Sequence, residues 1–279
     1  MLKESYRIGK CQSNKPFLLY TVPKLSNTIK LEDTAVMDKY KDLYKWMFVP
    51  LIVMQFGIFQ DYWGDFTDNA WSVHVHYWTG TAWYLYLIIQ PYFATHDQMS
   101  RHRTNGIIGI FIAGGVCLTA LSMMNRDIVN SQQAAEHPDR FGPFVPSFFI
   151  GVAVVEVVMM TAFGFAVIKS ITRRKRLEDH AWWLISTVFM IMMPALGRGL
   201  QNVYIAMRAA EMPNVSIMIP LYVTQVVILA LLLGWAWKYG KLKHPATYLA
   251  VGVNLFIFLL EPIGRSETVQ SIMTSVVKG

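Results

Sequence analysis

Seven long apolar segments constrain the fold of this sequence more than any other feature. Only 15% of the residues are charged and 54% are hydrophobic, whereas a soluble domain carries about a quarter charged residues. A membrane-spanning helix needs about 20 predominantly apolar residues. The sequence therefore predicts an all-α, polytopic membrane bundle of about seven transmembrane helices, over residues 43–60, 69–94, 105–124, 144–169, 181–207, 215–238 and 246–260.

The connections between these segments alternate in charge. Residues 1–42 carry eight basic side chains, the connection 61–68 carries three aspartates and no base, and residues 169–176 carry five basic side chains. Basic residues concentrate in cytoplasmic loops, so we expect a cytoplasmic amino terminus and an external carboxyl terminus. The predicted organisation is a polar cytoplasmic leader (1–42), a transmembrane bundle (43–262) and a short external tail (263–279).

The net charge of +7 follows from this loop pattern, so nucleic-acid binding is not expected. Residues 1–45 lack the apolar core of a cleavable signal peptide. Cys11 and Cys117 lie far apart and imply no disulfide framework. We expect an integral protein of the bacterial inner membrane, in contact with the lipid bilayer and with other membrane subunits or a quinone as candidate partners.

Ionisable residues inside predicted spans are costly and mark candidate functional sites, and three of them are the main candidates. The helix directions place His76, Glu156 and Arg198 in the outer half of the membrane at comparable depth. Such a cluster neutralises its own charge, and it serves as a proton or electron path, a substrate site, or a structural clamp between helices. Four amides are expected to extend the polar lining: Gln201, Asn202, Gln225 and Asn254.

His74 and His76 are two residues apart and point in directions about 200° apart on a helix. Only one of them is therefore expected to face a given neighbour. The stripe that continues His76, with small and polar side chains down to Gln90, favours His76 as the inward residue.

A second pair of histidines is predicted at the inner face. His102 opens the third span and His180 opens the fifth, so their helices begin on the same side. Two histidines from different helices are the usual axial ligands of a b-type haem, and His76 and His96 are alternative ligands. The competing interpretation places both imidazoles at the membrane interface as helix caps or headgroup contacts.

Several classes are excluded by missing motifs. The last span has no Schiff-base lysine, and the sequence has no histidine boxes, C-x-x-C-H haem attachment motif or phosphate-binding loop. The motifs that are present resemble a bacterial domain-of-unknown-function family of predicted multi-pass membrane proteins. The resemblance covers about residues 70–201 and rests on four marks. These are a histidine in the second span (His74 or His76), an H-R-x-x-G turn (His102, Arg103 and Gly106), an H-x-x-W helix entry (His180 and Trp183) and a downstream arginine (Arg198).

The resemblance implies a helical membrane fold, with fold-level similarity to b-type cytochromes and ferric-reductase-like bundles. The family usually has Met-x-Arg after the tryptophan, where this chain has Leu184, Ile185 and Ser186. The histidine pair and this fold-level similarity lead us to expect a membrane redox component, which carries a b-type haem or works with a quinone, or a subunit of a respiratory complex. The alternatives are a proton-coupled transporter or channel that uses His76, Glu156 and Arg198, and a non-catalytic structural subunit.

Overall fold

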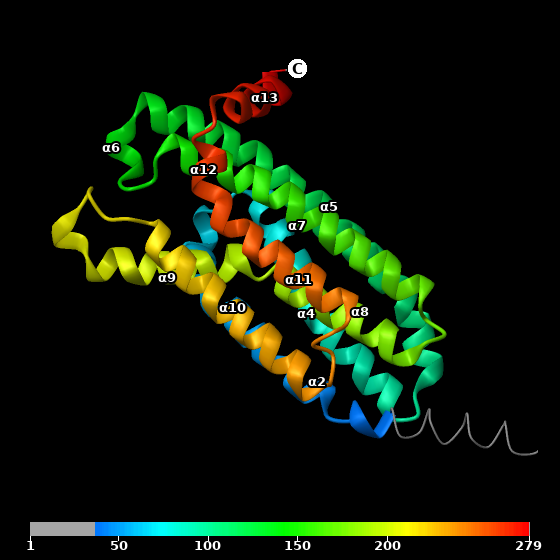
Figure 1. Cartoon of the computed structure of the whole chain (residues 1–279). Helices are drawn as coiled ribbons and strands as arrows, with labels where there is room; N and C mark the ends of the chain where they lie inside the picture. The colour runs from blue at the N-terminus through cyan, green and yellow to red at the C-terminus, as the bar shows by residue number, and fades with distance from the viewer. Residues whose placement is uncertain (1–36, 279) are drawn as a thin grey trace, which may run out of the picture.

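The computed structural model describes residues 37–278, and every regular element in that part of the chain is helical. Figure 1 shows the long helices running side by side in one tilted bundle. Five helical stretches are long and apolar enough to cross a membrane, which supports an integral, multi-pass membrane protein. These stretches are Met99–Glu136, Pro146–Thr172, Leu177–Met207, Met218–Lys238 and Pro245–Gly264.

The chain enters the bundle through two short helices, α2 (Leu43–Trp46) and α3 (Phe48–Gly57), and continues in a π-helical turn, η1 (Phe59–Gly64), and a 3-10 turn, η2 (Phe66–Asp68). The long helices α4 (Trp71–Thr95), α5 (Met99–Glu136) and α7 (Pro146–Thr172) follow, with α6 (Pro138–Phe141) between the last two. The remaining elements are α8 (Leu177–Met190), α9 (Met193–Met207), η3 (Ala209–Glu211), α10 (Met218–Lys238), α11 (Pro245–Phe256), η4 (Ile257–Leu259), α12 (Leu260–Gly264) and α13 (Glu267–Lys278).

The connections gather at two opposite ends of the bundle. One end holds α6 and the turn between α9 and α10, and we call it the α6 end; the other holds α2 and the turn between α7 and α8, and we call it the α2 end (Figure 1). Helix α5 has 38 residues, so it is about 57 Å long at 1.5 Å per residue. It therefore exceeds the roughly 30 Å of a hydrocarbon core.

Helices continue past two of the predicted boundaries. The third apolar segment was expected to end at residue 124, but α5 continues to Glu136, which places Arg126 and Asp127 on a helix instead of in a connection. The tail predicted for 263–279 begins with the end of α12 and contains the helix α13. The first two predicted segments coincide with α2–α3 and α4, which are not among the five apolar stretches. The leader lies almost wholly outside the described residues, together with Cys11.

The fifth apolar segment is broken in its middle, because α8 ends at Met190 and α9 begins at Met193. Backbone carbonyls freed inside an apolar bundle need other donors. Asn254 supplies its Nδ2 to the Phe189 carbonyl at 3.0 Å, and the Tyr84 hydroxyl donates to the Val188 carbonyl at 3.3 Å. Neighbouring helices thus stabilise the break, which lies beside the cavities described below.

Glycines allow α3 and α9 to pack in direct backbone contact. A Cβ on Gly57 would lie 2.3 Å from the Ala195 carbonyl oxygen, and a Cβ on Gly199 would lie 2.7 Å from the Gly57 Cα. No other residue fits at either position without parting the helices. This contact brings η1, which follows α3 directly, against the carboxyl-terminal half of α9.

Candidate functional site

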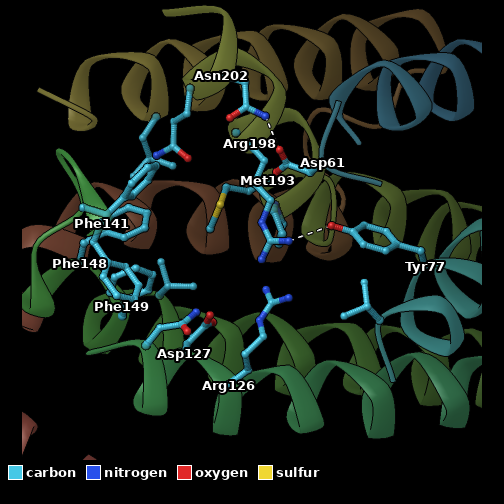
Figure 2. A pocket seen from close by; sticks show the side chains of 18 of the residues that line it. Asp61, Tyr77, Arg126, Asp127, Phe141, Phe148, Phe149, Met193, Arg198 and Asn202 are labelled. Atoms are coloured by element: carbon cyan, nitrogen blue, oxygen red, sulfur yellow. Dashed lines mark hydrogen bonds between the residues drawn. The ribbon is translucent and has the colours of Figure 1, made fainter. Parts of the chain in front are cut away.

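A chamber of about 460 Å³ opens at the α6 end between η1, α4, α5, α7 and α9. Figure 2 shows two arginines pointing toward one another across it, Arg126 from α5 and Arg198 from α9. We call this space the α6-end chamber. The polar residues that line it are Asp61, Asp65, Asn69, Tyr77, Arg126, Asp127, Asn130, Arg198, Gln201 and Asn202.

The two guanidinium groups have few protein partners. Arg198 Nη1 donates to the Tyr77 hydroxyl at 2.8 Å. The Nε atom of Arg126 is buried and has no hydrogen-bond partner among the described residues. The ion pairs of the described part of the chain include neither arginine. Both arginines line the chamber and point toward one another there (Figure 2).

The acidic side chains surround the arginines without closing on them. Asp61 accepts a hydrogen bond from the Asn202 amide, which the dashed line in Figure 2 marks. Asp65 is exposed, and Asp127 is only 5% exposed and lines the chamber. Negative charge is thus distributed around the wall, and no carboxylate of residues 37–278 lies within 4.0 Å of either guanidinium.

A smaller cavity of about 90 Å³ continues the chamber toward the interior. His76, Glu156 and Arg198 all line it, and it shares Tyr77 and Asp127 with the chamber. Glu156 is 9% exposed and its Oε2 has no hydrogen-bond partner among the described residues. His76 Nδ1 lies 3.4 Å from the Thr119 hydroxyl. The three ionisable residues singled out by the sequence therefore border one space, although they come from three helices.

The other residues expected in this lining divide into two groups. Gln201 and Asn202 line the chamber, whereas Gln225 and Asn254 are buried and line neither cavity. His74 was expected to point away from the side of α4 that carries His76. It does not line the cavity that His76 lines, and it is buried beside Tyr62, with its Nδ1 3.0 Å from the Tyr62 hydroxyl.

One wall of the α6-end chamber is aromatic. Figure 2 shows Phe141, Phe148 and Phe149 on the side opposite Tyr77, and Phe144 completes the wall. The rings pack on one another, with Phe141 and Phe149 centred 5.6 Å apart. The chamber therefore joins a charged half to an apolar half.

The second candidate site lies at the α2 end, where His102 of α5 and His180 of α8 meet. Their ring centres are 6.2 Å apart with the planes perpendicular. His180 Nδ1 lies 3.0 Å from the Ser170 carbonyl oxygen and 2.8 Å from its hydroxyl, and His102 Nδ1 lies 3.4 Å from the Gln90 carbonyl oxygen. A carbonyl oxygen only accepts, so each Nδ1 carries the proton and each Nε2 keeps a free lone pair.

Two cavities flank this histidine pair. The larger, of about 440 Å³, lies between α4, α5, α7 and α8, and the smaller has about 60 Å³. Gly106 lines the larger one, and a Cβ there would meet no atom within 4 Å. Gln90 lines both cavities, and its buried side-chain amide has no hydrogen-bond partner among the described residues. Arg103 and Arg174 also line the larger cavity.

The alternative haem ligands are placed elsewhere. The ring of His96 stacks on Tyr92 with centres 4.3 Å apart, and its Nδ1 bonds the Tyr92 carbonyl. His76 lines the cavity that continues the chamber. Within residues 37–278, no group of three or more His, Cys, Asp or Glu side chains is arranged to hold a metal ion.

Sequence reasoning missed Arg126 and Asp127 because it placed them in a loop. A helical signal was nevertheless present: Ala120, Met123, Asp127 and Ser131 recur at spacings of three and four residues, and all four are buried on α5. Asp61 was likewise assigned only a role in topology.

Comparison with protein-family models, curated proteins and solved structures finds no match to this chain. The likeness to the family of predicted membrane proteins thus remains one of short motifs. The helices of the chain itself identify it as a helical, multi-span membrane protein.

Proposed function

We propose that this protein is a membrane electron carrier that holds a b-type haem between His102 and His180. The observation that carries the proposal is the geometry of the pair: two imidazoles from different helices, centred 6.2 Å apart, each with Nδ1 directed at a backbone carbonyl. Metal-bound histidines almost always donate their other ring N–H to such an acceptor, which fixes the ring and raises its basicity.

The separation of the rings fits two ligands of one iron. An imidazole nitrogen lies about 1.1 Å from its ring centre and about 2 Å from a metal ion it binds, so two imidazoles that share one metal ion have centres up to roughly 6 Å apart. His102 and His180 would hold the iron. A haem held by these two residues would supply reversible one-electron transfer.

The surroundings also fit a large, mostly apolar ring with an anionic edge. Gly106 leaves space beside the pair, and the cavity of about 440 Å³ extends from it between four helices. Arg103 and Arg174 border the same cavity and match the carboxylates of haem propionates. The unpartnered amide of Gln90 gives a further donor and acceptor at the cavity wall.

We further propose that α2–α3 and α4 join the five apolar stretches as spans, which gives seven spans with the amino terminus in the cytoplasm. The alternating charge of the connections supports this, and so does the bundle, in which α4 packs against α5. The histidine pair then lies near the cytoplasmic face and the α6-end chamber near the outer face. Labelling of single cysteines with an impermeant reagent in whole cells tests it: position 140 should react and position 175 should not, and the reverse pattern would overturn the orientation.

Absorption spectroscopy of the purified, haem-supplied protein tests the haem. We expect a Soret band that shifts on reduction with dithionite, and a pyridine haemochromogen of b type. His102→Ala and His180→Ala should each abolish or strongly weaken the low-spin spectrum, with partial rescue of it by added imidazole. His137→Ala is the matched control, because His137 is exposed at the α6 end. A colourless, iron-free protein that is folded would refute the proposal.

Proton-coupled transport is the second candidate, favoured by one observation. The break between α8 and α9 lies beside the cavity that His76, Glu156 and Arg198 share, and transporters often use discontinuous helices at their binding sites. Proton flux into liposomes that falls when Glu156 becomes Gln supports this function. Flux equal to that of empty liposomes counts against it.

A further inference from the structure

We propose that the α6-end chamber is a binding site for an organic anion, whose carboxylate or phosphate lies between Arg126 and Arg198 and whose apolar body lies against the phenylalanine wall. This site is separate from the histidine pair and does not depend on a haem being bound there.

Two arginines from different helices face one space in the chamber. They enter from α5 and α9 on opposite sides and point toward one another (Figure 2). Neither forms an ion pair among the described residues, and only Arg198 makes a side-chain hydrogen bond, to Tyr77. A guanidinium offers five N–H donors in a planar fork that matches a carboxylate or phosphate. Two such forks facing one space define an oxyanion site.

The nearby acids do not occupy that position. Asp61 is already engaged by the Asn202 amide, and Asp65 is exposed at the mouth. Asp127 follows Arg126 on the same helix, so its side chain leaves α5 in a direction about 100° away. These carboxylates lower the cost of holding two arginines together, while the donors between the arginines remain available for a ligand.

The opposite wall defines the rest of the ligand. Phe141, Phe144, Phe148 and Phe149 present apolar rings to a chamber of about 460 Å³, a size typical of small-molecule sites. An inorganic anion would leave these rings without a partner. The chamber thus fits an aromatic or medium-chain acid, or the headgroup and first carbons of an anionic lipid, which share an oxyanion head on an apolar body.

Equilibrium binding of tritiated decanoate to the full-length protein in phosphatidylcholine nanodiscs tests the proposal. We expect saturable binding above that of empty nanodiscs. Unlabelled decanoate should compete at least 10-fold better than methyl decanoate, which has the same body without the charge, and better than inorganic phosphate. Competition by phosphatidic acid at the level of decanoate would identify a lipid as the source of the same chemistry. Absence of saturable binding, or equal competition by acid and ester, would overturn the proposal.

Substitution of each arginine locates the site. Arg126→Gln and Arg198→Gln should each weaken decanoate binding 10-fold or more, and Arg126→Lys should give an intermediate loss because an ammonium lacks the planar fork. Arg208→Gln is the matched control, since Arg208 lies at the same end but pairs with Glu211 at 2.9 Å outside the chamber. Unchanged affinity in folded protein with Arg126→Gln or Arg198→Gln would place the anion elsewhere and refute the site.

Discussion

Gly199→Ala should separate α3 from α9, because the added methyl group has no space. The new Cβ would lie 2.7 Å from the Gly57 Cα and 2.9 Å from its carbonyl oxygen. Two carbon atoms in contact lie about 3.5–4.0 Å apart, so the helices would have to part by roughly 1 Å. The movement would also draw Asp61 away from Asn202, because only Ile58 separates η1 from α3.

The cost follows from overpacking of a close helix contact. Extra methyl groups in a well-packed interior typically destabilise by about 1–3 kcal/mol, whereas alanine is intrinsically better in a helix than glycine by about 1 kcal/mol. Gly234→Ala isolates the second effect. Gly234 lies on α10, and a Cβ there would meet no atom within 4 Å. The difference between the two variants therefore measures the clash.

Thermal unfolding of both variants in one detergent, followed by circular dichroism, gives that difference. For a chain of this size about 1 kcal/mol corresponds to 2–4 °C in Tm, so Gly199→Ala should melt roughly 2–12 °C below Gly234→Ala. Gly234→Ala should match or slightly exceed the parent protein. Equal Tm values for the two alanine variants would show that α3 and α9 do not pack through their glycines.

Two further substitutions probe the break and the α2 end. Asn254→Leu removes the donor to the Phe189 carbonyl, and the unsatisfied buried acceptor should lower the stability of the folded protein by about 1–3 kcal/mol. The Tm of this variant is compared with that of the conservative Asn254→Gln, and an unchanged Tm in Asn254→Leu would contradict the role of Asn254. Burial lowers the pKa of His244, although the hydrogen bond that its Nε2 donates to Asp179 acts in the opposite direction. Neutral His244 caps α11, because its Nδ1 accepts a hydrogen bond from the Ala246 amide. Protonation is disfavoured in the folded state, so stability should be full above the unfolded pKa of about 6.5 and decline as pH falls below it. The Tm of His244→Asn should lose this part of the pH dependence, and a parallel decline in both proteins would contradict it.

The helical class and most helix positions could be predicted because a bilayer imposes a long apolar run on every span. The places where prediction failed are those where another contact replaces that requirement. The break after Met190 depends on Asn254 and Tyr84, which reach the freed carbonyls from α11 and α4. No local pattern in the fifth segment reports donors so distant in sequence. Pro194 permits a kink at this place but does not specify a break.

The candidate sites divide in the same way. His102 and His180 could be predicted to approach because both begin helices on one side of the bundle, and the described structure brings their rings to 6.2 Å. The two carbonyls that orient them, from Ser170 and Gln90, belong to other helices. Their contribution depends on the packing of α7 and α4, so it was visible only in three dimensions.

The α6-end chamber shows why hydropathy underestimates a membrane site. When hydropathy is averaged over 18 or more residues, a predicted span ends where charged residues first appear. On α5 the predicted span therefore ends just before Arg126. The helix continues because Asp127 and Ser131 remain on its buried face, with Ser131 bonded to the Pro146 carbonyl of α7. Charged residues at the end of an apolar run are therefore of two kinds, those that leave the bundle and those that turn into it. Helical spacing separates them: Asp127 continues the buried stripe of α5, and its neighbour Arg126 borders the chamber together with Arg198, where we propose that the two arginines hold an anion.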